Sequence, residues 1–278
     1  MDKGFAEKGS VEKNATQGLE GLRAQVVEVR EKVVDVLTEM DHIRLQEIPS
    51  IQADYAVRIG CWEAELLRAE LACRRAKRRL ELVRSRTNRG EAVDVAEIDA
   101  QLDRELADWQ TQVEAKLEQQ ASALKWQTSY GAMGFYDAAE VRRVFHVLAK
   151  RLHPDLHPED AERCRRLFEI ARAAYGHGDL ATLQSLEVST RGFEKGDHDL
   201  DDLSAEELAQ ALELTQMELE LRQQDLAALR QSPEVQLGEH LEDPLWVKRR
   251  VDELKRAIRE FDEARAGYEG RLAELGVV

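Results

Sequence analysis

The segment HPDLHP, residues 153–158, gathers two histidines, one aspartate and two of the five prolines of the chain. Histidines four residues apart can bind a metal from one face of a continuous helix, but each is followed here by a helix-ending proline. A hydrolase would need a nucleophile beside His153, and the nearest thiol, Cys164, falls on the apolar face of the next predicted helix. We therefore expect no enzyme activity, no catalytic residue, no metal site and no cofactor.

Two predicted helices position this segment. Asp137 can cap a helix over residues 138–152, which Pro154 ends, and Pro158 suits the first turn of the next helix. Both helices repeat apolar residues at helical spacing, so they should pack as an antiparallel pair with His153 and Asp155 at the exposed tip. The inner faces are Val141, Val144, Phe145, Leu148, Ala149 and Leu152 in the first helix, and Cys164, Leu167, Phe168, Ala171, Ala174 and Tyr175 in the second.

The polar side of the first helix is basic. It carries Arg142, Arg143, Lys150 and Arg151, and only Glu140 opposes them. A basic surface of this kind would attract an acidic partner and steer the encounter.

These features together resemble the J domain of the DnaJ co-chaperone family. That family has a basic second helix, a His-Pro-Asp loop and a third helix with Phe and Tyr on its inner face. Here the matching stretches are VRRVFHVLAKRL, the residues His153, Pro154 and Asp155, and RLFEIARAAY, in which Phe168 and Tyr175 are seven apart as in the family. The resemblance covers residues 137–187 of the 278.

The resemblance implies a role and roles for single residues. The basic side chains of Arg142, Arg143, Lys150 and Arg151 would dock on a DnaK-type ATPase chaperone of the heat shock protein 70 family. His153 and Asp155 would stimulate its ATPase, with Pro154 keeping the loop rigid. The family's first helix has no counterpart in KWQTSYGAMGFYD, so we expect the long helix that ends near Trp126 to replace it.

A long helical hairpin is predicted before this unit. Helical patterns run over residues 19–45, up to an interruption at Pro49, and then over residues 59–83 and 95–124, with a reversal at Gly90. Residues 68–89 carry 9 basic and 2 acidic residues, and residues 91–118 carry 9 acidic and 2 basic ones. Opposite charges of this kind favour antiparallel pairing of the two arms, with Trp62 and Trp109 in the seam, over a nucleic-acid patch.

A second hairpin is predicted after it. Ser204 and Glu207 form a capping box that begins one helix, and the last helix shows an apolar stripe from Val247 to Leu275. Residues 193–243 carry 15 acidic and 3 basic residues, which indicates an acidic linker and a solvated helix face.

Composition excludes several classes of protein. The net charge of −15 argues against nucleic-acid binding, and no apolar run is long enough to span a membrane. Three cysteines without C-x-x-C spacing suit the reducing cytoplasm, and the polar N-terminus does not look like a signal peptide.

We therefore expect an all-α cytoplasmic protein, in which long antiparallel coiled-coil hairpins flank a small J-domain-like unit. The hairpins would bind a client or another helical protein, and self-association stays open. The alternative is a structural adaptor in which the J-like unit is only a spacer. The expected division is a mobile lead-in at 1–18, a helical region with the first hairpin at 19–128, the J-like unit at 129–190, an acidic linker at 191–203 and the C-terminal hairpin at 204–278.

Overall fold

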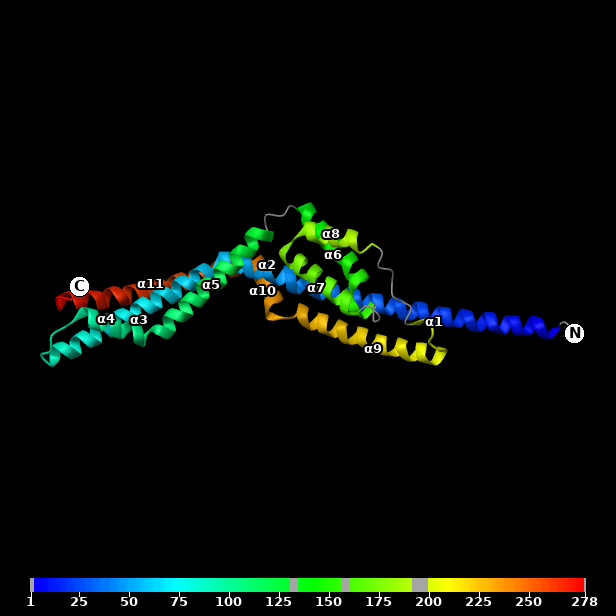
Figure 1. The fold of residues 1–278 in the computed structure, drawn as a ribbon. Coiled ribbons are helices and arrows are strands. Elements are labelled where there is room, and N and C mark those ends of the chain that lie inside the picture. Colours follow the sequence, from blue (N-terminus) through cyan, green and yellow to red (C-terminus); the bar gives the residue numbers. More distant parts are fainter. Residues whose placement is uncertain (1–2, 131–134, 157–160, 192–199, 278) are drawn as a thin grey trace. The chain divides into compact units, whose positions relative to one another are not determined.

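A computed structural model describes residues 3–130, 135–156, 161–191 and 200–277. Within these ranges the chain forms helices and no strand, which confirms the all-α prediction (Figure 1). None of the described helices combines the length and the apolar character that crossing a membrane requires.

The chain divides into two compact units, and each is assembled from two separate segments. Residues 1–49 and 128–236 form unit 1, and residues 50–127 and 237–278 form unit 2. Both units therefore combine regions that the sequence analysis assigned to different domains.

Unit 1 is built around its first helix. Helix α1 (Lys3–His42) packs along α9 (Ala205–Arg230) and also against α6 (Phe135–Leu152). The helices α7 (Ala161–His177) and α8 (Leu180–Ser189) complete a second layer on α6. Val26, Leu200 and Leu208 form the core beneath α9, and a larger core lies between α6, α7 and α8. The predicted lead-in is helical from Lys3 onward.

Pro49 does not interrupt the helical run, contrary to the prediction. It lies inside α2 (Ile48–Tyr55), which directly follows a π-helical segment, η1 (Ile43–Glu47). Proline lacks a backbone donor and crowds the preceding turn. The wider turn of a π-helix tolerates both defects, so the helix can continue.

Unit 2 surrounds helix α3 (Cys61–Asn88), which follows the π-helical segment η2 (Ala56–Gly60). Helices α4 (Val95–Glu105) and α5 (Ala107–Tyr130) follow on one side, and α11 (Pro244–Glu274) packs along α3. Helix α10 (Pro233–Glu242) leads into α11. The unit has two core clusters: Leu80, Val83, Ile98, Leu102 and Leu272 form the first, and Ile59, Leu241, Val247 and Leu254 the second.

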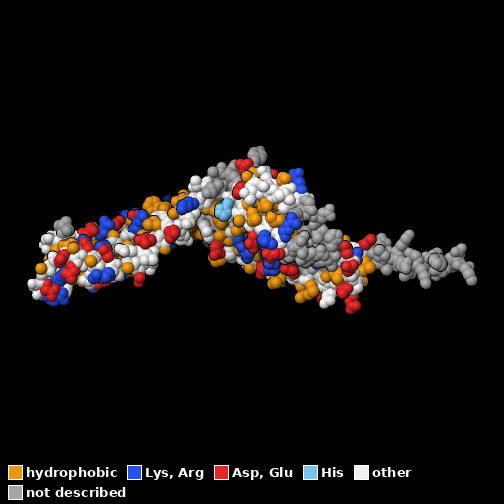
Figure 2. All heavy atoms as spheres, viewed as in Figure 1, with side chains coloured by type: hydrophobic (Ala, Val, Ile, Leu, Met, Phe, Trp, Pro, Cys, Tyr) orange, Lys and Arg blue, Asp and Glu red, His pale blue; other side chains and the backbone are white. Residues whose placement is uncertain are grey.

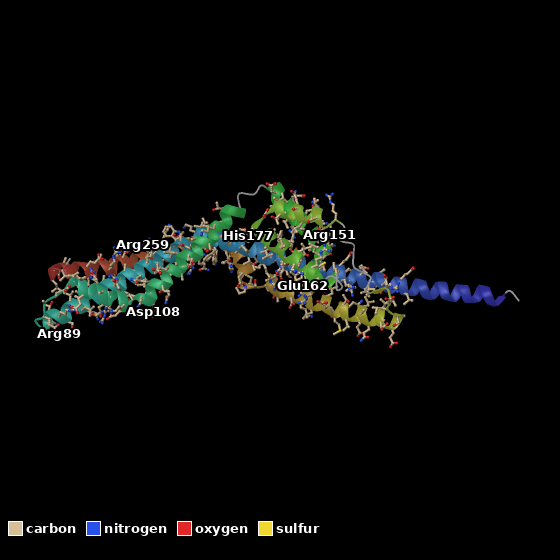
Figure 3. The ribbon with its side chains drawn as sticks, viewed as in Figure 1. Arg89, Asp108, Arg151, Glu162, His177 and Arg259 are labelled. Carbon is tan, nitrogen blue, oxygen red and sulfur yellow. The ribbon has the colours of Figure 1, made fainter. Side chains whose placement is uncertain are left out.

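The chain reverses at Gly90, as predicted. Gly90 adopts a φ of 68°, and the amide of Glu91 donates to the carbonyl of Arg86 at 3.0 Å. Arg89 marks the tip of this turn (Figure 3). Beyond it, the basic residues of α3 meet the acidic residues of α4 in the pairs Arg75–Asp103 (2.6 Å), Arg78–Glu105 (2.7 Å), Arg86–Glu97 (2.9 Å) and Arg79–Asp99.

The predicted C-terminal hairpin is wrong. Helix α9 packs on α1 within unit 1, whereas α11 packs on α3 within unit 2. For the same reason Trp62 is not in the predicted seam. It packs against the core formed with α10 and α11, and Lys255 Nζ lies 4.2 Å from the centre of its ring. Trp109 does face α3, where the Arg74 guanidinium lies 4.2 Å from its ring centre.

Candidate functional site

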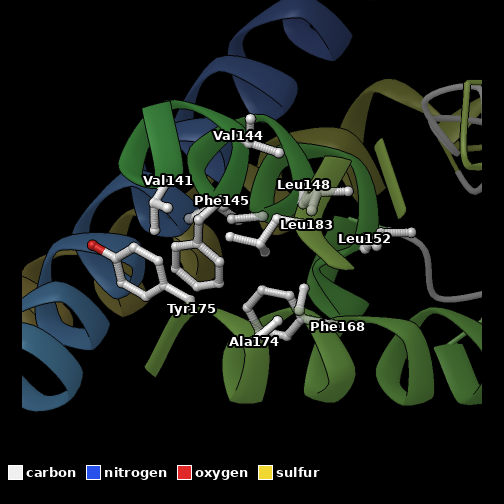
Figure 4. Packing of buried hydrophobic residues seen from close by; sticks show 12 residues of the cluster. Val141, Val144, Phe145, Leu148, Leu152, Phe168, Ala174, Tyr175 and Leu183 are labelled. Carbon is white, nitrogen blue, oxygen red and sulfur yellow. The ribbon is translucent and has the colours of Figure 1, made fainter. Parts of the chain in front are cut away.

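Helices α6 and α7 pack antiparallel on the predicted apolar faces. Phe145 stacks on Tyr175, with ring centres 4.1 Å apart, while His153, just after α6, lies next to Phe168 in the middle of α7. The resulting core is the largest cluster of buried hydrophobic residues in unit 1 (Figure 4). It contains Val141, Val144, Phe145, Leu148, Ala149, Leu152, Phe168, Ala171, Ala174, Tyr175 and Leu183, with Val34 from α1.

The helix ends agree with the sequence at two of the four points, the C-terminal ends of α6 and α7. Helix α6 ends at Leu152, and a 3₁₀ turn, η3 (Pro154–Leu156), follows it. Gly178 ends α7 with a φ of 68°, and the amide of the following residue donates to the carbonyl of Ala174 at 2.9 Å. However, α6 begins at Phe135, so Asp137 lies in its first turn and is not its cap. The predicted start at Pro158 lies outside the described residues.

His153 is buried, contrary to the expected position at an exposed tip. Its side chain is 8% exposed, and its ring meets Phe168 edge-on at 5.1 Å and 67°. Its amide still donates to Ala149 as in a helix, and its carbonyl accepts the amide of Leu156 at 3.0 Å. Pro154 is half-buried in η3. The backbone of Asp155 belongs to the same turn, but its side chain lies outside the described residues.

Two of the four basic residues are paired with carboxylates of α1. Arg142 Nη2 donates to Glu39 Oε2 at 2.9 Å, and Lys150 Nζ lies 2.9 Å from Asp35 Oδ1. His146 Nε2 is 3.5 Å from the same Asp35 oxygen. Helix α1 therefore presents acidic side chains to part of the predicted basic surface.

The other two basic residues bind partners on α6 and α8. Arg143 Nε donates to Glu140 Oε2 at 2.8 Å, and its Nη1 lies 3.5 Å from Glu187 Oε1. Arg151, at the C-terminal end of α6, donates to the Glu187 carbonyl at 2.8 Å and to Thr190 Oγ1 at 3.1 Å (Figure 3). Arg142 and Arg143 keep about half of their side-chain surface exposed.

The helix ending near Trp126 does not complete the J-like unit, contrary to the prediction. Helix α1 and the π-helical segment after it contact α6 and α7 instead. Asp41 holds Arg172 of α7 in a two-point contact, with both N–O distances at 2.7 Å. Gln46 of η1 is buried and donates its amide to the carbonyl of Tyr175 near the end of α7. The sequence analysis missed this role, because isolated Asp and Gln residues on a long helix carry no local signal of their partners.

His42 joins α1 to the aromatic core. Its Nδ1 lies 2.7 Å from the hydroxyl of Tyr175. Burial and the nearby Arg142 guanidinium lower the pKa of His42 from its ordinary 6.5. The burial favours a neutral imidazole, and His42 lines a groove of about 580 Å³ between α1 and α6.

No metal or nucleophile site accompanies these residues in the described part of the chain. No group of three or more potential metal ligands occurs there. Cys164 belongs to α7 and is completely buried, and it is not among the residues that line the groove.

No family model matches the chain, and no curated protein or solved structure matches it significantly.

Proposed function

We propose that this protein is a J-domain-like co-chaperone that binds a DnaK-type chaperone and stimulates its ATPase. The observation that carries the proposal is the antiparallel pair α6 and α7 with His153, Pro154 and Asp155 between them. The resemblance rests on the order of the loop residues and on the apolar residues beside them. Phe145 packs on Tyr175, and His153 packs on Phe168. These contacts support the proposal that the apolar faces of α6 and α7 pair as in the J-domain family.

Docking in this proposal requires the basic side chains to change partners. Arg142 and Lys150 are held by Glu39 and Asp35 of α1, so an acidic chaperone surface would compete with α1 for them. Exposed ion pairs contribute about 0–1 kcal/mol each, so such an exchange is energetically accessible. Arg143 and Arg151 contribute through the part of their side chains that α8 leaves uncovered.

The test is ATP hydrolysis by the chaperone of the same organism, with the full-length chain added. The parent protein should accelerate hydrolysis, and Asp155→Asn should remove the acceleration, because the family resemblance assigns the trigger to the loop. Asp179→Asn is the matched control. Asp179 caps α8 through the Thr182 amide at 3.0 Å, away from the loop, so the acceleration should persist.

The alternative is a structural adaptor, which the pairing of the basic residues within unit 1 favours. If the parent protein leaves the ATPase rate unchanged, the adaptor becomes the better proposal. If Asp155→Asn accelerates hydrolysis as well as the parent does, the proposed role of the loop is wrong.

A further inference from the structure

The outer face of α9 carries three large apolar side chains that the described residues leave uncovered. Leu214, Met217 and Leu221 are 60%, 61% and 53% exposed. Their spacing of three and four residues places them on one face of the helix, which we call the α9 stripe. The face that packs on α1 is a different one and includes Leu208 and Leu212. Hydrophobic and acidic side chains are mixed along α9 (Figure 2).

Acidic residues border the α9 stripe on both sides. In a heptad that places Leu214 and Leu221 at position a and Met217 at d, three glutamates occupy position g: Glu206, Glu213 and Glu220. Positions e and g flank the seam between two packed helices and meet the charges of the partner. None of these three glutamates is ion-paired with another described residue. The e border holds Glu218 and Asp225, 3.3 and 3.6 Å from Arg222.

The acidic residues on both sides of the α9 stripe determine which kind of partner could bind to it. In a parallel pair with a second copy, position g meets position e, and in an antiparallel pair g meets g. Glutamate or aspartate would meet glutamate in both cases, and like charges at facing positions destabilise helix pairs. An anionic membrane surface would be repelled in the same way.

We propose that the α9 stripe is a docking site for a helix of another protein that has an apolar seam bordered by lysine or arginine. Leu214, Met217 and Leu221 would supply the apolar contact, and the g glutamates would select a basic partner and set its register. This proposal stands on α9 alone and does not depend on the chaperone function.

The experiment measures binding of labelled peptides to the full-length protein by fluorescence anisotropy. The probe is a peptide of about four heptads with leucine at a and d and lysine at e and g. One control peptide replaces those lysines by glutamate, and another has the same composition in an order without heptads. The basic heptad peptide should bind at least about tenfold more tightly than either control, which corresponds to one decade in Kd.

Variants of the chain separate the α9 stripe from general electrostatic attraction. The triple variant Leu214→Gln, Met217→Gln and Leu221→Gln should weaken binding of the basic peptide at least about tenfold. Its matched control, Val188→Gln with Leu245→Gln, alters two apolar residues of other helices that are 57% and 70% exposed, and should bind like the parent. Glu213→Lys with Glu220→Lys should shift the preference toward the acidic peptide.

Two results would overturn the proposal. One is equal binding of the basic peptide by the parent and the triple variant. The other is a dimer of the parent in sedimentation experiments that the same triple substitution dissociates, because a second copy would then cover the α9 stripe.

Discussion

Because His153 is buried, its substitution should affect the stability of the protein as well as any function of the His-Pro-Asp segment. Replacing this residue by glutamine removes the edge-on contact with Phe168 inside a packed core. We predict that His153→Gln lowers the free energy of unfolding by about 1 kcal/mol, the size of an aromatic pair contribution. Urea unfolding followed by circular dichroism checks it.

The control for this prediction is His177→Gln, an exposed residue of the same helix pair that should change stability by less than about 0.5 kcal/mol. Equal stability of the parent and His153→Gln would contradict the prediction. A loss of ATPase stimulation in His153→Gln therefore counts for the loop only after correction for the unfolded fraction.

Glu63 of α3 concentrates polar contacts in unit 2. Its carboxylate accepts from the Tyr55 hydroxyl at 2.5 Å and lies 2.8 Å from Lys116 Nζ and 3.3 Å from Arg250 Nη2. Burial alone raises the pKa of Glu63, but the hydrogen bonds from Lys116 and Tyr55 outweigh it, so the pKa lies below the ordinary 4.5. Burial and the hydrogen bond to Glu63 raise the pKa of Tyr55 to about 12.

We predict that Glu63→Gln costs about 2 kcal/mol of unfolding free energy at pH 7, the scale of hydrogen bonds to a charged group. Because the pKa is lower in the folded than in the unfolded chain, this stabilisation is complete above about pH 4.5 and is lost as the pH falls through the folded value. Denaturant unfolding at pH 7 and pH 3 should show the difference between parent and variant shrinking. A difference of the same size at both pH values would count against the ionised network.

At the scale of elements, the turn between α3 and α4 depends on one glycine. Gly90 has a φ of 68° and nothing within 4 Å of an added Cβ, so Gly90→Ala carries a conformational cost without a steric clash. We predict a loss of about 1 kcal/mol, measured by thermal or urea unfolding.

Gly267 is the matched control within the same unit. It lies inside α11 in helical geometry, and an added Cβ would also have nothing within 4 Å of it. Gly267→Ala should stabilise the protein by about 0.5–1 kcal/mol. Opposite signs for the two substitutions are the expected result, and equal signs would show that the turn does not constrain the chain as described.

Helix α1 competes for the basic residues of α6 in the proposed function. Asp35→Asn with Glu39→Gln removes the carboxylate partners of Lys150 and Arg142. We predict that binding to the DnaK-type chaperone becomes several-fold tighter, while stability changes by less than about 1 kcal/mol. Isothermal titration calorimetry measures the binding.

Glu28→Gln is the control, because Glu28 pairs with Lys32 on α1 itself at 2.7 Å and should leave binding unchanged. If the parent binds the chaperone but the double variant binds no more tightly, the competition is absent although the function holds. If the parent does not bind at all, the proposed function itself fails.

The helices also show how much of the fold can be predicted from the sequence. Helical periodicity located the long helices, because a repeat of 3.6 residues is a local property, but it missed the short helices α8 and α10. It could not identify which helices pack together, because an apolar stripe fits any other apolar stripe. Complementary charges correctly indicated that α3 meets α4. Beyond Ser204 the prediction relied on sequence proximity alone and paired α9 with the wrong helix.

The candidate site, too, was predicted from the sequence only in part. The sequence located the pairing of α6 with α7, because its apolar faces lie within one short segment. It did not reveal that Asp35, Asp41 and Gln46 of the N-terminal segment contact this pair. Those contacts join residues more than a hundred positions apart, and each such residue alone looks like an ordinary polar residue on a helix surface.

At the scale of the whole molecule, the tryptophans report on only one of the two units. All four lie in unit 2, at positions 62, 109, 126 and 246. Phe145, by contrast, is buried in the core of unit 1. We predict that Phe145→Ala destabilises unit 1 by about 3–5 kcal/mol. The transition seen by circular dichroism should become biphasic, while the midpoint seen by tryptophan fluorescence should stay unchanged.

Leu80→Ala provides the comparison, because Leu80 belongs to the core of unit 2. This substitution should lower the fluorescence midpoint. If Phe145→Ala lowers the fluorescence midpoint equally, the two units unfold as one cooperative body and the division has no thermodynamic meaning.

The assembly of each unit from two distant segments has a consequence for synthesis on the ribosome. Val26 of α1 meets Leu208 of α9, and Leu80 of α3 meets Leu272 of α11. The first helix of each unit therefore emerges with an apolar face whose partner has not yet been translated. Closing such long loops slows folding, and exposed apolar faces favour aggregation in the meantime. The nascent chain should thus be a substrate for holding chaperones until its last helix, ending at Glu274, has left the exit tunnel.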